Sequence, residues 1–319
     1  MLAKFEDVKN ILICPRSGCP LVQEGDYFMP FDGEKSSKIR YGSVSGQPVL
    51  VDFDNSVLDE NEIFILNGAS VLQRRQSRLR NWIKGSLLHP DANRLAGRIA
   101  RQFARMLKEK VKKPRLLMVG AGGKGIGTDL FYDDPDIQVI GFDIYASPLT
   151  HFIADTHQIP IKSESVDGVW LQYVLEHVLD PWRVVGEVRR VLNNKGLVYG
   201  ETPFLQQVHE GAYDFIRFTH SGHRWLFRDF TEIKSGIAMG PGVSLLWTLE
   251  HNVRGIFRSR AIGHIAKLVL FWLQFIEKII PVDYCFDNAS SFYFFGSKAN
   301  TPLQPKDIVR YYRGHCKTY

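Results

Sequence analysis

The chain has 319 residues, of which 45% are hydrophobic and 23% charged, and its formal net charge is +6. This composition is that of an ordinary globular protein with one large domain or two smaller ones. Its four scattered cysteines, Cys14, Cys19, Cys285 and Cys316, argue against a disulfide scaffold and suit a reducing cytoplasm. The first residues, MLAKFEDVKN, lack the long apolar core of a secretory signal, so we expect a cytoplasmic protein.

Residues 1–60 predict a small β-rich unit. ILICPRSGCPLV places apolar residues around two cysteines, and GQPVLVDF follows a turn as a strand. The pattern Cys-Pro-x-x-x-Cys-Pro-Leu resembles one half of a zinc ribbon. A tetrahedral zinc site needs four ligands, and the next cysteine, Cys285, lies more than 260 residues away. We therefore predict a degenerate zinc-ribbon-like module that binds no metal.

The basic excess of the chain lies in residues 74–115, which hold fourteen Lys and Arg against two acids and so carry +12, leaving −6 elsewhere. The spacing predicts a helix over 92–113 within a basic linker, 61–114. One face is apolar, and the other is a basic stripe of Arg94, Arg98, Arg101, Arg105, Lys108 and Lys112. The stripe is either a solvated surface or a contact for polyanions. Because no RNA-binding signature accompanies it, a lipid headgroup or carrier phosphate is preferred over nucleic acid.

From 115 to about 235 the chain alternates strand and helix patterns. The clearest strands are RLLMVGA, IQVIGFDI, VDGVWLQYV and KGLVYGETP. This alternation predicts an α/β fold with a doubly wound, Rossmann-like sheet, whose ligands sit at the carboxyl ends of the strands.

Further along, VSLLWTLEH (243–251) and SFYFFGS (291–297) predict two more strands. Between them, residues 265–280 are apolar almost all round and predict a helix in an insert at about 254–282. Sixteen residues are short for a bilayer span of about 20. The segment is either a buried helix, a dimer contact or an in-plane membrane anchor preceded by Arg254, Arg258 and Arg260. Residues 301–319 remain as a C-terminal tail.

The stretch LLMVGAGGKGIGTDL (116–130) is a buried strand that runs into a glycine-rich turn. A following helix would point free N–H groups at an anion or a polar ligand edge. Alone, the loop fits a nicotinamide dinucleotide, a flavin, S-adenosylmethionine or a simple tight turn. Asp143, which ends the next strand, can accept both hydroxyls of a ribose, and Asp155 can accept from an adenine amino group.

The stretch LQYVLEHVLDPWRVVGEVRRVLNNKGLVYGETP decides between these ligands. Residues 115–204 resemble the class I S-adenosylmethionine-dependent methyltransferases, in the branch with a Leu-Glu-His motif and an Arg-Val-Leu-x-x-x-Gly turn. The resemblance implies a seven-stranded methyltransferase sheet over 115–300, with S-adenosyl-L-methionine as cofactor. The cofactor-binding residues that it implies are Gly120, Ala121, Gly122, Asp143, Ile144, Asp155, Thr156 and Gln172. In this branch an acidic residue usually precedes the first glycine by two positions, where this chain has Met118.

The chemistry requires alignment of an acceptor and, for a hydroxyl, removal of its proton. Candidate groups cluster in EHV and in PFLQQVHEGAYDFIRFTHSGHRWLF, which follows the fifth strand. We predict His177 and His209 as bases and Arg217 as the group that positions an anionic or polyhydroxyl acceptor. Asp214 and His220 can also reach the mouth of the pocket. Some quinone-pathway relatives bind a divalent metal through the Glu-His region, but we predict none here.

The acceptor is predicted from absences and from resemblance. The Asn-Pro-Pro-Tyr motif of amino methylation is missing after the fourth strand, which reads QYVLEH, and this favours oxygen. The chain as a whole resembles bacterial methyltransferases of surface-polysaccharide or secondary-metabolite pathways. We therefore expect O-methylation of a small-molecule, glycan or lipid-linked acceptor, with peripheral membrane association through the basic helix and residues 265–280. The alternative is a catalytically silent docking module.

Overall fold

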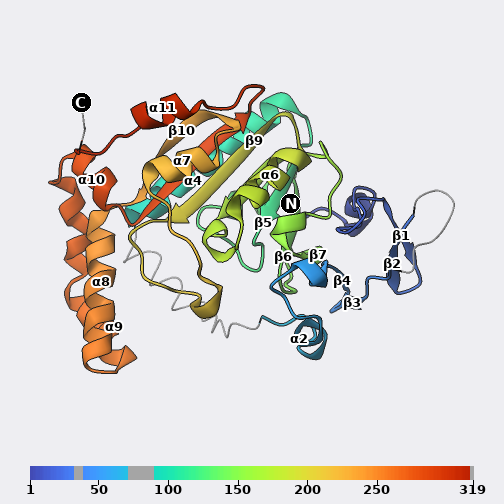
Figure 1. Ribbon diagram of the computed structural model, residues 1–319, viewed down its shortest axis with the longest axis horizontal. Coiled ribbons are helices and arrows are strands. Elements are labelled where there is room, and N and C mark those ends of the chain that lie inside the picture. Colours follow the sequence, from blue (N-terminus) through green and yellow to red (C-terminus); the bar gives the residue numbers. More distant parts are fainter. Residues whose placement is uncertain (32–38, 71–89, 317–319) are drawn as a thin grey trace.

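A computed structural model describes residues 1–31, 39–70 and 90–316. Its centre is a nine-stranded sheet in the order β10-β11-β9-β8-β5-β6-β7-β4-β3 (Figure 1). The middle of the sheet is parallel, whereas β10, β11 and β3 pair antiparallel to their neighbours. The strands are β3 (Ser43–Val44), β4 (Gln47–Leu50), β5 (Arg115–Val119), β6 (Gln138–Asp143), β7 (Phe152–Ala154), β8 (Val166–Gln172), β9 (Leu192–Pro203), β10 (Phe230–Met239) and β11 (Ser291–Lys298).

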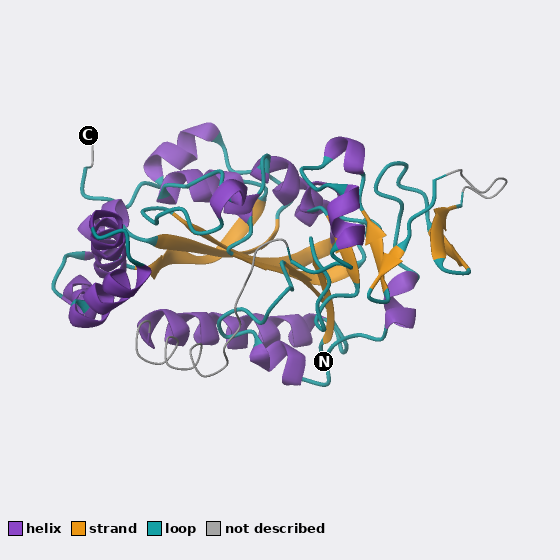
Figure 2. Cartoon of the chain, turned by 90° about the horizontal axis from the view of Figure 1, so that it is seen from below, coloured by secondary structure: helices purple, strands orange, loops and turns teal. Residues whose placement is uncertain are grey.

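The sheet lies between two layers of helices (Figure 2). On one face, α4 (Pro90–Lys110) and α5 (Asp129–Asp133) pack Phe103, Leu107 and Phe131 against buried strand residues. On the other face, α6 (Pro181–Val191) and α7 (His220–Leu226) add Val184, Val188 and Leu226 to a second core. The strands from β10 to β7 thus confirm the Rossmann-like doubly wound fold predicted from the sequence, because apolar runs here are covered on both faces.

The helix expected over 92–113 is α4, and its arginines at 98, 101 and 105 are exposed. Apolar residues of the same helix, such as Ile99 and Phe103, are buried. The amphipathic pattern therefore identified the element and its inner face. Residues 71–89 of the basic segment lie outside the described residues.

The N-terminal part contributes strands on both sides of the gap at 32–38. A hairpin of β1 (Leu21–Glu24) and β2 (Tyr27–Pro30) follows α1 (Phe5–Lys9) and is separate from the main sheet. Further on, β4 pairs parallel with β7 and so extends the main sheet, and α2 (Glu60–Ile65) comes next. The Cys14 thiol is buried 3.2 Å from the Tyr41 hydroxyl. That Cys14 and Cys19 bind no metal, and that a module ends near residue 60, stay predictions.

Two expectations about the C-terminal half were wrong. Residues 243–251 lie in the helix α8 (Pro241–Ile256), not in a strand, and the sixth strand of the sheet is β10. A short apolar run does not distinguish a buried strand from a helix, and Pro241 at the first helical turn favours the helix. Residues 265–280 are not one helix: α9 (Arg260–Val269) is followed by the 3₁₀ helix η5 (Phe271–Lys278).

The remaining helices are α10 (Val282–Asn288) and α11 (Pro305–Arg310), which lies within the predicted tail. Among the residues that the structure describes, no helix combines the length and the apolar character needed to cross a bilayer.

Candidate active site

A cavity of about 530 Å³ lies where β5, β6, β7 and β8 end. The carboxyl ends of parallel strands form the usual ligand crevice of such sheets, because loops there diverge around the switch in strand order. Most of the predicted cofactor residues line this cavity: Gly120, Asp143, Ile144, Asp155, Thr156 and Gln172. Ala121 and Gly122 belong to the turn behind it.

The glycine turn after β5 is closed by its own backbone. The N–H groups of Gly120 and Ala121 donate to the Phe142 carbonyl at 3.1 and 2.9 Å. Gly120 has φ +75°, and a Cβ there would lie 2.7 Å from Val174 Cγ2, so the position needs glycine. The helix expected to follow the glycine turn is α5, which begins at Asp129. That its N-terminus faces an anion or a polar ligand edge stays a prediction.

Asp143 is held in place by the turn. Its Oδ2 accepts from the Gly122 N–H at 2.6 Å, and its Oδ1 accepts from the Ile144 N–H at 2.7 Å. A carboxylate only accepts, and it is the kind of group that two ribose hydroxyls require. Gly122 serves a further purpose, because a Cβ there would lie 1.9 Å from the Tyr145 hydroxyl.

Asp155 is fixed by groups from two parts of the chain. Its carboxylate accepts from the Ser56 hydroxyl at 2.5 Å and lies 2.6 Å from His157 Nδ1. Burial raises the pKa of Asp155, but the hydrogen bonds from His157 and Ser56 outweigh it and hold the pKa below its ordinary value. The N-terminal part also supplies one wall of the cavity, which the sequence did not predict: Val57, Leu58, Asp59, Glu62, Ile63, Gly68, Ala69 and Ser70.

Gln172 offers an acceptor near the position where the expected acid is replaced by Met118. Its Nε2 donates to Glu201 Oε2 at 2.7 Å. Its Oε1 is shielded from solvent and has no hydrogen-bond partner among the residues that the structure describes. A Cβ on Gly125 would lie 2.4 Å from this oxygen, so the glycine loop makes room for it. Glu201, which the sequence did not single out, thus fixes the direction of the Gln172 carbonyl.

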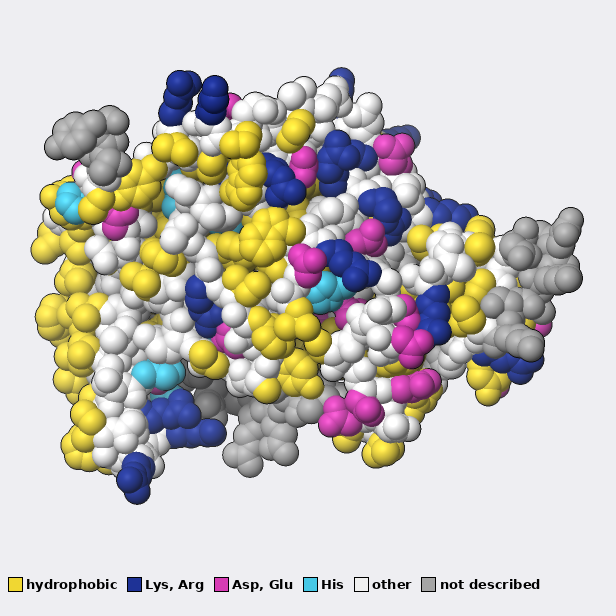
Figure 3. Space-filling model, in the orientation of Figure 1, with side chains coloured by type: hydrophobic (Ala, Val, Ile, Leu, Met, Phe, Trp, Pro, Cys, Tyr) yellow, Lys and Arg dark blue, Asp and Glu magenta, His cyan; other side chains and the backbone are white. Residues whose placement is uncertain are grey.

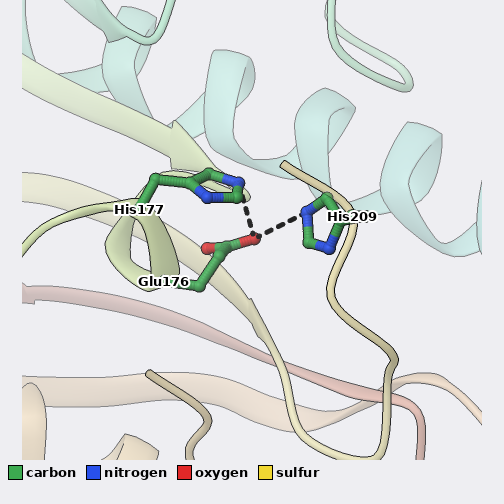
Figure 4. A group of neighbouring side chains, drawn as sticks. All are labelled: Glu176, His177 and His209. Carbon is green, nitrogen blue, oxygen red and sulfur yellow. Dashed lines mark ion pairs between the residues drawn. The ribbon is translucent and has the colours of Figure 1, made fainter. Parts of the chain in front are cut away.

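His177 and His209 also line the cavity, and the buried Glu176 lies beside both of them (Figure 4). Glu176 and His177 lie in the short helix η3 (Leu175–His177) after β8, and His209 comes from the loop after β9. Glu176 Oε1 lies 3.7 Å from His177 Nε2 and 3.8 Å from His209 Nε2. The two predicted bases therefore converge on one buried carboxyl group.

The carboxyl group of Glu176 is fully buried, and within the described part of the chain neither of its oxygens has a hydrogen-bond partner. Burial raises its pKa to about 8, so the neutral form predominates at pH 7. His177 lies 2.7 Å from the Tyr213 carbonyl through Nδ1, which must donate because a carbonyl only accepts. Nε2 of neutral His177 is therefore an acceptor on the Glu176 side. Burial also lowers the pKa of His177.

His209 is oriented by Asp214, which in turn is held by Arg217. The Asp214 carboxylate accepts the His209 backbone N–H at 2.9 Å and lies 3.3 Å from its Nδ1. Burial raises the pKa of Asp214, but Arg217 and the His209 amide lower it to about 2. Arg217 forms a forked pair with this carboxylate and also donates to the carbonyls of Gln206 and Gln207. Neither Asp214 nor Arg217 lines the cavity, so both brace the loop that carries His209.

His220 does not reach the cavity, contrary to the sequence-based expectation. Its ring is packed against Phe286, Phe292 and Tyr311. Burial lowers its pKa to about 4, which keeps it neutral. The ligand atoms of Glu176, His177 and His209 all lie within 4.8 Å of one another, so this group could hold a cation as well as pass a proton.

Residues 117–200 match a family model described as a methyltransferase domain. No curated protein matches the chain. A methyltransferase from Archaeoglobus fulgidus that depends on S-adenosylmethionine aligns over 69% of this chain and 99% of its own, at 12% identity and a TM-score of 0.42. Phosphoethanolamine N-methyltransferase 2 of Haemonchus contortus, solved with S-adenosyl-L-methionine, aligns over 63% of this chain and 53% of its own, at 14% identity and a TM-score of 0.40. The [4+2]-cyclase SpnF aligns over 64% of this chain and 81% of its own, at 15% identity and a TM-score of 0.39.

The domain match covers the strands β5, β6, β7 and β8 and most of β9, whose carboxyl ends surround the cavity. The chain thus contains a methyltransferase domain on a Rossmann-like sheet. It is an S-adenosylmethionine-dependent methyltransferase, and S-adenosylmethionine is its cofactor.

Proposed function

We propose that the protein methylates a hydroxyl group of a small-molecule, glycan or lipid-linked acceptor, with His209 as the general base. One observation supports this most: His209 and His177 converge on one carboxyl group and line the same cavity as Asp143 and Asp155. An acceptor in this cavity beside the cofactor would have a base within the same space. The second candidate, a silent docking module, keeps the fold without using this arrangement.

At the cofactor end, Asp143 would accept the ribose hydroxyls, and Asp155 with Thr156 would flank the adenine. Gln172 Oε1, a shielded acceptor without a partner, would accept from the methionine ammonium in place of the acid absent at Met118. Glu201 behind Gln172 would keep that oxygen pointing into the site. When bound, S-adenosylmethionine would supply an electrophilic methyl group. The acceptor oxygen would form a bond to the methyl carbon, and the electron pair of the broken carbon–sulfur bond would stay on sulfur.

At the acceptor end, His209 would take the hydroxyl proton on Nε2, because Nδ1 faces Asp214 at 3.3 Å. The carboxylate of Asp214 would stabilise the resulting imidazolium, as a positioned base requires. Its low pKa keeps it ionised at neutral pH. His177, whose Nδ1 is committed to the Tyr213 carbonyl, is the second candidate base.

The location that we propose is the cytoplasm, with peripheral association at the membrane when the acceptor is lipid-linked. Support comes from the free thiols of all four cysteines and from exposed basic residues on α4. A membrane-associated enzyme would reach an acceptor anchored in the bilayer without extracting it.

The proposal is tested by a cofactor-dependent methylation screen over sugar, lipid and phenol acceptors, with mass detection. On an acceptor found in this way, His209→Ala should lower turnover about 100- to 10,000-fold while cofactor affinity stays nearly intact, because the base acts only on the acceptor. His315→Ala, which removes a partly exposed histidine outside the cavity, is the matched control.

An unchanged turnover in His209→Ala would remove His209 from the base role. Cofactor binding without methylation of any acceptor class would favour the silent docking module.

A further inference from the structure

A helical hairpin extends from one end of the sheet. It consists of α8 and α9, joined by the turn Phe257–Ser259, and η5 packs back against α8 (Figure 1). The carbonyl of Leu273 in η5 would lie 2.3 Å from a Cβ on Gly242, so the two segments are in close contact. One side of α9 and η5 is thereby covered, and the opposite side is exposed.

The exposed side of this hairpin is apolar. Ile265 is 58% exposed, Val269 is 66% exposed and Ile279 is 84% exposed. Exposed large apolar side chains continue along α9 and η5 and end directly after them: Ile262, Ile265, Leu268, Val269, Trp272, Phe275 and Ile279. We call this set the hairpin face. Apolar side chains gather along this edge of the molecule in Figure 3.

The charges at the tip of the hairpin are basic. Between Glu250 and Glu277 the chain has Arg254, Arg258, Arg260 and Lys267. Lys267 is paired with Glu250 at 3.1 Å, so the arginines carry the excess charge. Arg258 and Arg260 are exposed at the turn between the helices. An exposed apolar face bordered by arginines matches an anionic bilayer surface, where headgroups take the charges and acyl chains take the apolar groups.

The inner side of α8 connects the hairpin to the acceptor end of the cavity. Trp247 lines the cavity. The Thr248 hydroxyl accepts from the Gln207 amide at 2.8 Å, and the Ser244 hydroxyl donates to the Leu205 carbonyl at 2.9 Å. The loop that α8 holds in this way carries His209. A membrane on the hairpin face would therefore lie beside the element that positions the proposed base.

We propose that the hairpin face docks in the plane of an anionic lipid bilayer, with Arg258 and Arg260 on the headgroups. This inference rests on the membrane association proposed above, and its test needs no acceptor. Lipid binding is measured without turnover, so its failure and the failure of the methylation proposal are separate results.

The test is co-sedimentation of the full chain with vesicles of phosphatidylcholine alone or mixed with phosphatidylglycerol. The chain should bind the mixed vesicles. The double variant Ile265→Glu/Leu268→Glu should bind them at least about 10-fold more weakly, because two apolar side chains that would enter the bilayer become charged. Arg258→Gln/Arg260→Gln should weaken binding about 30-fold at low salt. Val309→Glu makes the same kind of change at a residue that is 77% exposed on α11, outside the hairpin, and should have no effect.

Cofactor affinity, measured on each variant, shows that the fold is intact. Equal vesicle binding by the wild type and both double variants would overturn the proposal. So would a wild-type dimer that Ile265→Glu/Leu268→Glu dissociates while neither protein binds vesicles, since the hairpin face would then be an interface between two copies.

Discussion

The proposed role of Gln172 gives the sharpest test of the cofactor site. Gln172→Met conserves the size of the side chain and removes the shielded oxygen that we assign to the methionine ammonium. A hydrogen bond to a charged group contributes about 1.5 to 3 kcal/mol, which corresponds to about 10- to 150-fold in affinity. S-adenosylmethionine should therefore bind the variant weaker by that factor.

The matched ligand is 5′-methylthioadenosine, which has the adenosine but lacks the amino-acid part. Calorimetry should give the same affinity of this ligand for the wild type and for Gln172→Met. Asp143→Ala should behave in the opposite way and weaken both ligands, because they share the ribose. The pair of variants and the pair of ligands thus separate the two ends of the cofactor.

Two results would refute the reasoning on Gln172. Unchanged binding of S-adenosylmethionine to the variant would show that another group accepts from the ammonium. An equal loss with both ligands would show that Gln172 supports the fold of the site through Glu201 and makes no specific contact.

Four further predictions follow from the structure. Asp143→Ala should cost about 2 to 4 kcal/mol of cofactor binding, or about 30- to 1000-fold by calorimetry, through loss of the ribose acceptor. Elemental analysis should find no stoichiometric zinc at Cys14 and Cys19, and turnover should survive a chelator; activity restored by a divalent ion would contradict this. The pKa of Glu176 is raised from 4.5 to about 8 in the folded protein. Its contribution to stability is therefore greatest below pH 4.5 and is lost as the pH rises through 8. The thermal unfolding of Glu176→Gln should depend less on pH over this range than that of the wild type. Salt-sensitive binding to anionic vesicles should weaken on charge reversal in α4, at Arg98, Arg101 and Arg105.

The sheet and the cofactor end were predictable because their evidence is local in the sequence. Each central strand is a short apolar run that ends in a polar residue or a glycine turn. The carboxyl ends of parallel strands meet at one edge, so Asp143, Asp155 and Gln172 had to come together once the strands were assigned. Their contacts with the N-terminal part were not predictable, since Ser56 reaches Asp155 across about a hundred residues of intervening chain.

The C-terminal half was harder because periodicity there gives conflicting indications. Residues 243–251 are apolar enough for a buried strand, but they belong to α8, which packs against η5. The strand β10, FTEIKSGIAM, is interrupted by charges and by two shifts in register, so its pattern is weak. Tertiary packing, not local propensity, determined the secondary structure of both segments.

The residues around His209 show most clearly which features of the site could not be predicted from the sequence. Histidines and acids could be listed from EHV and the loop after β9, but their division into bases and braces depends on which side chains meet. The guanidinium of Arg217 donates to Asp214 and to three backbone carbonyls, so a residue typical of ligand binding instead fixes a loop. Glu201 was available from register alone: it lies opposite Gln172 in the parallel β8–β9 pair, where side chains on neighbouring strands meet. Polar residues that end adjacent parallel strands should therefore be analysed as pairs, because one can orient the other.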